Sequence, residues 1–198
     1  MSNTKYIIGI DEVGRGPIAG PVTLGSFVFI DCNAKKMFKG VKESKQLSEN
    51  KREEWFAVIT EAKKRGQVDF AVDSQSNKII DSKGIIHAIN KSLANVLKKL
   101  NIKANSCCVL LDGGLRAPIQ YVDQKTIIKG DEKEMVIALA SICAKVTRDR
   151  YMKKISKKYS NYDFHIHKGY GTKKHYMTIK KHGLTDIHRR SFISGVND

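Results

Sequence analysis

The chain has 198 residues, and its 41% of hydrophobic residues is enough to bury a substantial core and form one main domain. Its 36 Lys and Arg outnumber its 20 Asp and Glu, and the resulting net charge of +16 favours a polyanionic partner, of which nucleic acid is the most common. The lack of a long apolar run excludes a membrane span, and we expect no secretory signal. The four cysteines lack the spacing of a zinc site. We therefore expect a cytoplasmic protein whose cysteines are reduced, core-type thiols.

The predicted elements alternate between strands and helices, which is typical of an α/β fold. Short apolar runs predict strands over residues 5–10, 22–30, 68–72, 107–111 and 121–128. Apolar residues at helical spacing predict helices over residues 49–65, with Ser48 as N-cap, 83–100 and 135–152. The last forty residues are the most basic, and we expect a main domain over residues 1–155 and a basic helical region over residues 156–198 packed on it.

Acidic residues directly follow three of the predicted strands. Asp11 and Glu12 follow the first, Asp112 the fourth and Asp131 the fifth. If these strand ends are neighbours in one sheet, the four carboxylates raise one another's pKa values unless cations neutralise them. Oxygen ligands without cysteine or histidine suit Mg²⁺ or Mn²⁺. Two such ions can activate a water and stabilise the leaving oxygen of a phosphodiester.

Each acid also has a purely structural interpretation. An aspartate at a strand end is commonly a turn former or a helix cap, and Asp131 is well placed to cap the helix that follows it. The shared glycine neighbours favour the ligand interpretation, because a substrate backbone can approach closely where no Cβ is present. Asp149, between two arginines late in a helix, is predicted to form a structural ion pair instead.

Six segments between residues 8 and 192 carry a family resemblance. They are, in chain order, GIDEVGRGPIAGPV, VKESKQLSENKRE, LLDGG, KGDEKEMVIALASICAKVTRDR, HKGYGT and HGLTDIHRRSF. Together they resemble the signature segments of bacterial ribonuclease HII. The resemblance implies a ribonuclease H-like fold, with a mixed central sheet flanked by helices and a small C-terminal helical region. It also implies an endonuclease that hydrolyses the RNA strand of RNA·DNA hybrids and cuts 5′ of single ribonucleotides in duplex DNA, leaving a 3′-hydroxyl and a 5′-phosphate.

By motif, the resemblance assigns metal binding and catalysis to the same four acids, with Mg²⁺ or Mn²⁺ in a two-metal mechanism. Three features depart from the family pattern. Glu132 follows the KGD aspartate where a small residue is usual, Leu139 replaces an alanine, and DGGLRAP replaces a polar run. These changes bear on local packing and metal affinity and leave the four acids in place.

The resemblance also assigns residues that sense the ribonucleotide. Detection of its 2′-hydroxyl falls to the backbone of Gly14, Arg15 and Gly16, whose alternative interpretation is a plain tight turn. The ring of Tyr170 is assigned to the deoxyribose that follows the ribonucleotide, whereas the alternative is an aromatic that anchors its loop to the core.

Three cationic residues, Lys45, Arg189 and Arg190, are predicted to contact phosphates. The alternative is that they only solvate the surface. The six histidines show no ligand spacing with the acids, so they receive no role.

Two other functions stay open. One is the ribonuclease HIII type, which carries an extra N-terminal substrate-binding domain; the ten residues before Asp11 and the KGYGT loop favour HII. The other is a non-catalytic basic module that binds nucleic acid. We expect a monomer whose partners are RNA·DNA hybrids and ribonucleotide-containing duplex DNA, with no membrane partner and no partner-binding peptide in residues 194–198.

Overall fold

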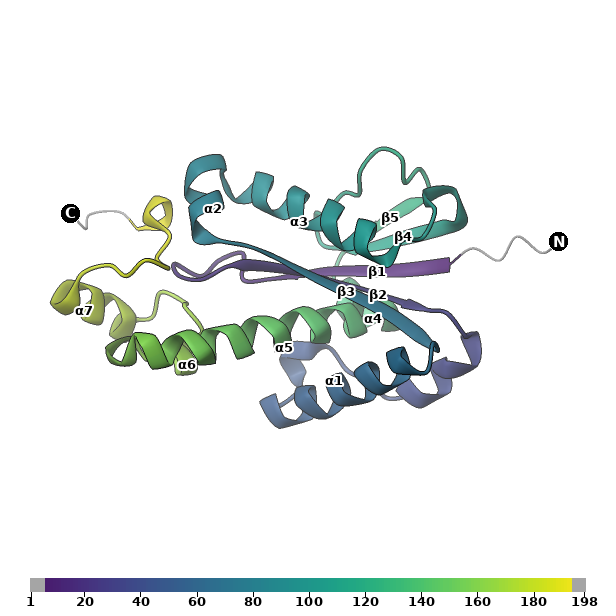
Figure 1. The fold of residues 1–198 in the computed structure, drawn as a ribbon, viewed down its shortest axis with the longest axis horizontal. Helices are drawn as coiled ribbons and strands as arrows, with labels where there is room; N and C mark the ends of the chain where they lie inside the picture. Colours follow the sequence, from purple (N-terminus) through teal and green to yellow (C-terminus); the bar gives the residue numbers. More distant parts are fainter. Residues whose placement is uncertain (1–5, 194–198) are drawn as a thin grey trace.

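The computed structural model describes residues 6–193, so the expectation for residues 194–198 lies outside the described residues. One five-stranded sheet lies between helices on both of its faces (Figure 1). The elements are β1 (Tyr6–Val13), β2 (Val22–Phe29), α1 (Glu49–Lys64), β3 (Val68–Gln75), α2 (Asn77–Lys83), α3 (Ile85–Leu100), β4 (Cys107–Asp112), β5 (Gln124–Ile127), α4 (Gly130–Lys133), α5 (Met135–Lys158), α6 (Phe164–His167) and α7 (Lys173–His182). Short 3₁₀ turns include η2 (Ser44–Gln46).

The strand order β3-β2-β1-β4-β5 makes the sheet mixed. β1, β2 and β3 are antiparallel neighbours, whereas β4 runs parallel to β1 and β5 parallel to β4. This confirms the predicted α/β class with a mixed central sheet flanked by helices. The register sets Ile10 opposite Leu111, so the residues that follow them, Asp11 and Asp112, come from distant parts of the chain to the same end of the sheet.

Helices cover the two faces of the sheet at different distances. α3 packs on one face, and α5 with α1 packs on the other (Figure 1). α5 comes unusually close because the strands below it carry glycines. A Cβ on Gly9 of β1 would lie 2.2 Å from the carbonyl carbon of Val136, and one on Gly25 of β2 would lie 2.2 Å from the Ala140 oxygen. The backbone of α5 therefore rests directly on the two strands.

Several predicted bounds differ from the observed ones. The first strand continues through the two acids to Val13, because Asp11 and Glu12 pair with β2. The fifth strand is shorter than predicted and covers only Gln124–Ile127. A separate helix, α2, precedes α3, and Gly84 with a φ of +83° divides them. The N-cap prediction for α1 is confirmed, since the Ser48 side chain accepts a hydrogen bond from the N–H of Lys51.

The four cysteines differ in burial. Cys107 and Cys143 are buried, as predicted, and Cys108 is half-buried, but Cys32 is exposed, so its assignment to the core is wrong. Cys32 begins a surface 3₁₀ turn (Cys32–Phe38) in which Ala34 and Phe38 supply the buried side chains. No helix within residues 6–193 is both long and apolar enough to cross a membrane.

The C-terminal residues pack around a third hydrophobic cluster. Its buried members are Ile18, Ala19, Met152, Tyr162, Phe164, Ile179 and Ile187. Because Ile18 and Ala19 belong to the turn between β1 and β2, the cluster joins the C-terminal region to that turn. The predicted boundary between residues 155 and 156 falls inside α5, so both parts share this helix, and the division into domains stays a prediction.

Candidate active site

Two aspartates lie side by side where β1 and β4 run parallel. Asp11 and Asp112 follow the paired residues Ile10 and Leu111, and the alternation of side chains along a strand turns both aspartates toward α5. Asp11 is 4% exposed, and the nearby Ser141 hydroxyl of α5 favours its ionised form. The close contact of α5 with Gly9 brings Ser141 near Asp11, because Ser141 lies just over one turn beyond the point of contact.

A main-chain hydrogen bond brings Asp131 to the same place. The N–H of Gly130 donates to Asp112 Oδ1 at 2.6 Å, which ties the start of α4 to the end of β4. Asp131 is buried in the first turn of α4. The capping interpretation of Asp131 is wrong, because the N-cap of the long helix α5 is Glu134.

Glu12 lies at the same end of the sheet and has one oxygen without a partner. Its Oε1 is 3.6 Å from Nη1 of Arg15, while its Oε2 is buried and has no hydrogen-bond partner within the described chain. Burial raises the pKa of Glu12; the charge of Arg15 opposes this rise and that of Asp112 adds to it.

The four acids repel one another electrostatically. Burial raises the pKa of Asp11 to about 8, the Ser141 hydroxyl opposes this rise, and the charges of Glu12, Asp112 and Asp131 add to it. Within residues 6–193, no three Asp, Glu, His or Cys side chains are already grouped so that they could hold a metal ion.

The donor set nevertheless has the chemistry of a divalent-cation site. All of its donors are carboxylate oxygens, the ligands that Mg²⁺ and Mn²⁺ prefer. A cation would satisfy the orphaned oxygen of Glu12 and would favour the ionised form of Asp11, which burial disfavours. The residues present therefore fit such an ion.

Replacing Asp11 with Asn is expected to stabilise the metal-free protein. The pKa of Asp11 is about 8 in the folded chain against an ordinary 3.8, so this carboxyl supports folding most at low pH, and that support is lost as the pH rises from about 4 to 8. An amide does not ionise, so at pH 7 the free energy of unfolding should increase by on the order of 2 kcal/mol. Urea denaturation in EDTA at pH 5 and pH 8 measures this. A gain no larger at pH 8 than at pH 5 would contradict the electrostatic cause.

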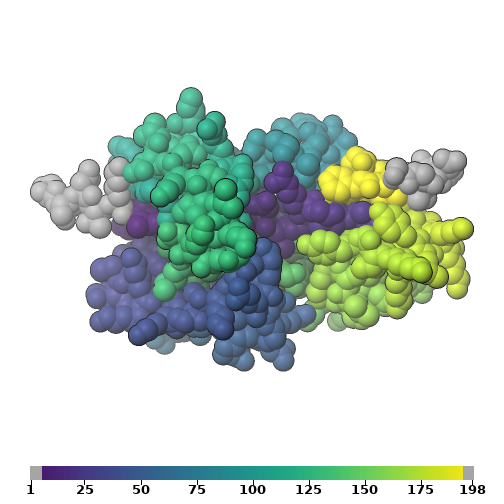
Figure 2. All heavy atoms as spheres, turned by 180° about the vertical axis from the view of Figure 1, so that it is seen from behind, coloured from purple at the N-terminus to yellow at the C-terminus, as the bar shows by residue number. Residues whose placement is uncertain are grey.

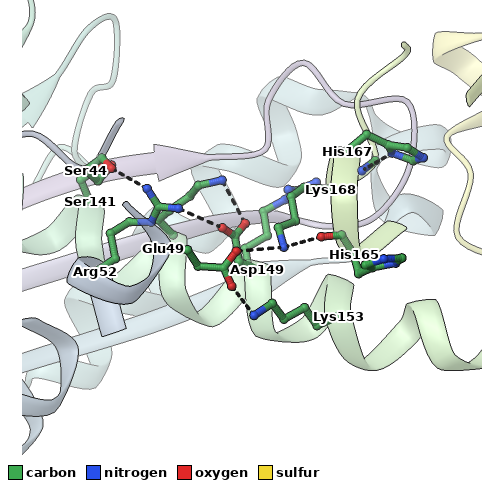
Figure 3. A network of polar contacts seen from close by, with 12 residues as sticks. Ser44, Glu49, Arg52, Ser141, Asp149, Lys153, His165, His167 and Lys168 are labelled. Atoms are coloured by element: carbon green, nitrogen blue, oxygen red, sulfur yellow. Dashed lines mark hydrogen bonds and ion pairs between the residues drawn. The ribbon is translucent and has the colours of Figure 1, made fainter. Parts of the chain in front are cut away.

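A polar network sets Lys45 beside the acids. Lys45 Nζ lies 3.3 Å from Asp131 Oδ2 and 3.2 Å from Glu43 Oε1, and 75% of its side chain is exposed. The hydroxyl of the preceding residue, Ser44, is hydrogen-bonded to that of Ser141 at 2.8 Å (Figure 3). The turn that carries Lys45 is therefore joined to the residue that lies near Asp11.

Arg52 of α1 is hydrogen-bonded to the turn that carries Lys45. Its Nη1 donates to the carbonyl of Ser44 at 2.9 Å (Figure 3) and to that of Leu47 at 2.5 Å. Its Nη2 lies 3.8 Å from Asp149 Oδ2, and Lys145 donates to the other oxygen of Asp149 at 3.0 Å. The structural ion pair predicted for Asp149 is confirmed, and its partners are Arg52 and Lys145.

The turn between β1 and β2 reaches the surface beside the acids. Gly14 is buried, whereas Arg15 and Gly16 are exposed. In Figure 2, the purple N-terminal segment reaches the surface between the green segment that follows β4 and the yellow-green C-terminal helices. The main chain of Arg15 and Gly16 is therefore accessible to a ligand on this face.

Tyr170 lies on a loop that is bonded to this turn. The carbonyl of Gly169 accepts hydrogen bonds from the N–H groups of Ile18 at 2.9 Å and Ala19 at 3.2 Å. Tyr170 itself is 46% exposed. Its ring is thus not an anchor buried in the core.

The two neighbouring arginines differ in exposure. Arg189 is completely buried, and its guanidinium donates to main-chain carbonyls, so its predicted phosphate contact is wrong. Arg190 is exposed, and its main-chain N–H donates to Asp81. Only Arg190 of this pair is kept as a candidate for a phosphate contact.

A buried chain of histidines under the Tyr170 loop was missed by the sequence analysis. The N–H of Thr185 donates to His188 Nδ1 at 2.7 Å, so His188 Nε2 donates to His175 Nε2 at 3.0 Å, and His175 Nδ1 donates to the Tyr170 carbonyl at 2.8 Å. Burial lowers the pKa of both histidines to about 4. These neutral rings support the loop, and no sequence spacing indicated it.

Comparisons with known proteins agree with this arrangement. The family model described as Ribonuclease HII matches residues 8–194. A Clostridium beijerinckii ribonuclease HII is 45% identical over 96% of this chain and 68% of its own length. A second, from Caldicellulosiruptor bescii, is 40% identical over 97% of this chain and 88% of its own length.

A solved structure extends the agreement to the fold. Ribonuclease H2 from Pyrococcus horikoshii superposes with a TM-score of 0.72 at 28% identity, covering 94% of this chain and 93% of that one. The predicted ribonuclease H-like fold is thereby confirmed. Among the candidate functions, the match is to type HII and not to a non-catalytic module. The chain belongs to the ribonuclease HII family.

Proposed function

We propose that this ribonuclease HII cuts the RNA strand of RNA·DNA hybrids, and duplex DNA on the 5′ side of a single embedded ribonucleotide, leaving a 3′-hydroxyl and a 5′-phosphate. Asp11, Glu12, Asp112 and Asp131 would hold divalent cations at the scissile phosphate. The observation that carries the proposal is the set of four carboxylates at one end of the sheet, of which Asp11 and Asp131 are buried and Glu12 has one orphaned oxygen.

The acids would have distinct positions in the site. Asp11, the more buried of the strand pair, is proposed as a ligand of both Mg²⁺ or Mn²⁺ ions. When bound, such ions activate a water and neutralise the charge that develops on the leaving oxygen. Asp112 and Asp131 would complete the ligand set from β4 and α4. Because these ligands all come from one chain, we propose that a monomer suffices, working in the cytoplasm on ribonucleotide-containing DNA.

The test is a cleavage assay on a DNA duplex that contains one ribonucleotide. We expect a single nick 5′ of the ribonucleotide with Mg²⁺ or Mn²⁺, no nick in EDTA, and no cut in the same duplex without the ribonucleotide. Mapping of the product ends checks the 3′-hydroxyl and 5′-phosphate. A nick that persists in EDTA, or one placed 3′ of the ribonucleotide, would overturn the proposal.

Removal of the Tyr170 ring is expected to reduce the preference for isolated ribonucleotides. A half-exposed ring can stack on the deoxyribose that follows the ribonucleotide, and such contacts contribute about 1–3 kcal/mol. In Tyr170→Ala, kcat/KM should therefore fall roughly tenfold on a single-ribonucleotide duplex and much less on a uniform RNA·DNA hybrid. The control is Tyr6→Ala, another exposed tyrosine, at the start of β1. An unchanged ratio between the two substrates would exclude the stacking role.

Arg52 is expected to act on the reaction through Lys45. Arg52→Ala frees the turn that holds Lys45, and we expect kcat/KM to fall about tenfold. In a Lys45→Ala background the same change should cost less than about threefold, because the residue it positions is gone.

Arg150→Ala is the matched control for this cycle. Arg150 also links α5 to α1, through a surface pair with Glu53, but it contacts no part of the turn. It should leave kcat/KM unchanged. Equal costs of Arg52→Ala with and without Lys45 would show that Arg52 does not act through that residue.

A further inference from the structure

We propose that Arg189 is the positioning residue that sets the main chain of Gly14, Arg15 and Gly16 for recognition of the ribonucleotide. This inference rests on the proposed function, since it concerns how that turn would read the 2′-hydroxyl. A buried guanidinium in the C-terminal segment would thus contribute to substrate specificity by holding a turn near the N-terminal end of the sequence.

The buried guanidinium of Arg189 is hydrogen-bonded to three carbonyls of the turn between β1 and β2. Its Nε donates to the Gly20 carbonyl at 2.9 Å, its Nη1 to Arg15 at 2.9 Å, and its Nη2 to Gly14 at 2.6 Å. The side chain has no exposed surface. One planar group thus fixes both the first and the last residues of the turn, which a flexible ammonium could not do in the same geometry.

Main-chain contacts fix the backbone of Arg189 beside the turn. Its N–H donates to the Ile18 carbonyl at 2.8 Å, and the preceding residue, His188, forms an isolated β-bridge with Ala19. The C-terminal segment therefore pairs with the turn through this bridge and the adjacent main-chain hydrogen bond. The position of the guanidinium is set by backbone pairing and not by its own rotamers alone.

A second buried arginine supports the same turn. Arg148 of α5 donates from Nε to the Pro21 carbonyl at 2.9 Å and from Nη2 to the Ala19 carbonyl at 3.3 Å. The Phe192 ring lies 5.2 Å from the Arg189 guanidinium. Within residues 6–193 neither arginine has a carboxylate at ion-pair distance, so the carbonyls of the turn are their main polar partners.

The carbonyl contacts determine where the amide groups point. In a trans peptide the C=O and the next N–H point in opposite directions. Because the Gly14 and Arg15 carbonyls face inward to Arg189, the N–H groups of Arg15 and Gly16 face the exposed side. Two adjacent outward donors suit an oxygen acceptor such as the 2′-oxygen of a ribose. Arg189 would create this donor pair without touching the ligand.

The test measures binding discrimination in the absence of cleavage. In an Asp112→Asn background with Mg²⁺, Kd is measured for a duplex with one ribonucleotide and for the all-DNA duplex of the same sequence. Arg189→Lys keeps the positive charge but loses the planar guanidinium with its several fixed donors. We expect the ratio of Kd for the all-DNA duplex to Kd for the ribonucleotide duplex to fall about tenfold, toward one. Kd for the all-DNA duplex itself should change less than about twofold. Thermal unfolding checks that the variant is folded.

Arg190→Ala supplies the contrast within the same pair. As a candidate phosphate contact it should weaken binding to both duplexes equally and reduce the slope of log Kd against log salt by about one. Arg189→Lys should leave that slope unchanged. Faster hydrogen exchange of residues 14–20 in Arg189→Lys is the second expected readout.

Different outcomes contradict the proposed function and the role of Arg189. If the parent protein does not prefer the ribonucleotide duplex, the proposed function fails. If the parent shows the preference and Arg189→Lys retains it, or if Arg189→Lys lowers the salt slope as a phosphate contact would, the positioning role alone is wrong.

Discussion

Asp112→Asn is expected to abolish cleavage while the enzyme still binds its duplex. The substitution removes one negative charge from the ligand set but keeps Oδ1, which accepts the N–H of Gly130, so α4 should stay tied to β4. We expect the single-turnover rate on a ribonucleotide-containing duplex to fall by on the order of 10³-fold or more, comparable to the loss of a principal electrostatic group in other active sites. Quenched-flow kinetics and a gel-shift assay measure the two properties.

Asp69→Asn is the matched control for this substitution. Asp69 lies on β3 of the same sheet and forms an ion pair with Lys63 at 2.6 Å, far along the strand order from the acids. It should leave the rate unchanged. Near-normal turnover of Asp112→Asn would remove that residue from the catalytic group, and loss of duplex binding would show that its role is not confined to the reaction.

Gly14→Ala is expected to disrupt the turn on which substrate recognition is proposed to depend. A Cβ there would lie 2.2 Å from Nε of Arg148 and 2.8 Å from the Pro21 carbonyl, and the φ of +88° is itself unfavourable for alanine. Both the strain and the displaced guanidinium should lower the free energy of unfolding, by about 3 kcal/mol together. Urea denaturation measures the loss of stability. The value of kcat/KM on a single-ribonucleotide duplex should fall at least tenfold.

Two other glycines separate the causes. Gly40 has a φ of +87° but nothing within 4 Å of its Cβ position, so Gly40→Ala should show the cost of backbone strain alone. Gly16→Ala meets neither problem in the free protein and should keep normal stability. If Gly16→Ala nevertheless lowers kcat/KM, its Cβ interferes with the bound substrate. A Gly14→Ala enzyme as stable as Gly40→Ala would mean that Arg148 can move away at little cost.

Patterns of apolar residues were sufficient to predict the main strands and the longer helices, whereas their arrangement in layers came from the family resemblance. The run over residues 5–10 and that over 107–111 each identify a buried strand, and their acids follow at once. What the patterns could not show is the parallel register that sets Asp11 beside Asp112, since pairing depends on contacts between distant segments. The candidate site became specific only through the family resemblance.

The errors arise where local sequence and tertiary environment disagree. Arg189 and Arg190 look alike in sequence, but the fold buries the Arg189 guanidinium against the carbonyls of the turn and leaves Arg190 exposed. The histidine chain was missed for a similar reason, because His175 and His188 have no regular spacing and meet only when the C-terminal segment folds back. Charge and polarity predict exposure on average, and they fail where main-chain carbonyls provide the partners.

The bond from Arg189 to Gly14 joins residues 175 positions apart. During synthesis Arg189 therefore leaves the ribosome long after the turn that it contacts, and also after all four acids. Under the proposed role of Arg189, a chain that stops before residue 189 would carry the four acids without the residue that fixes the turn, and it would lack the preference for a ribonucleotide.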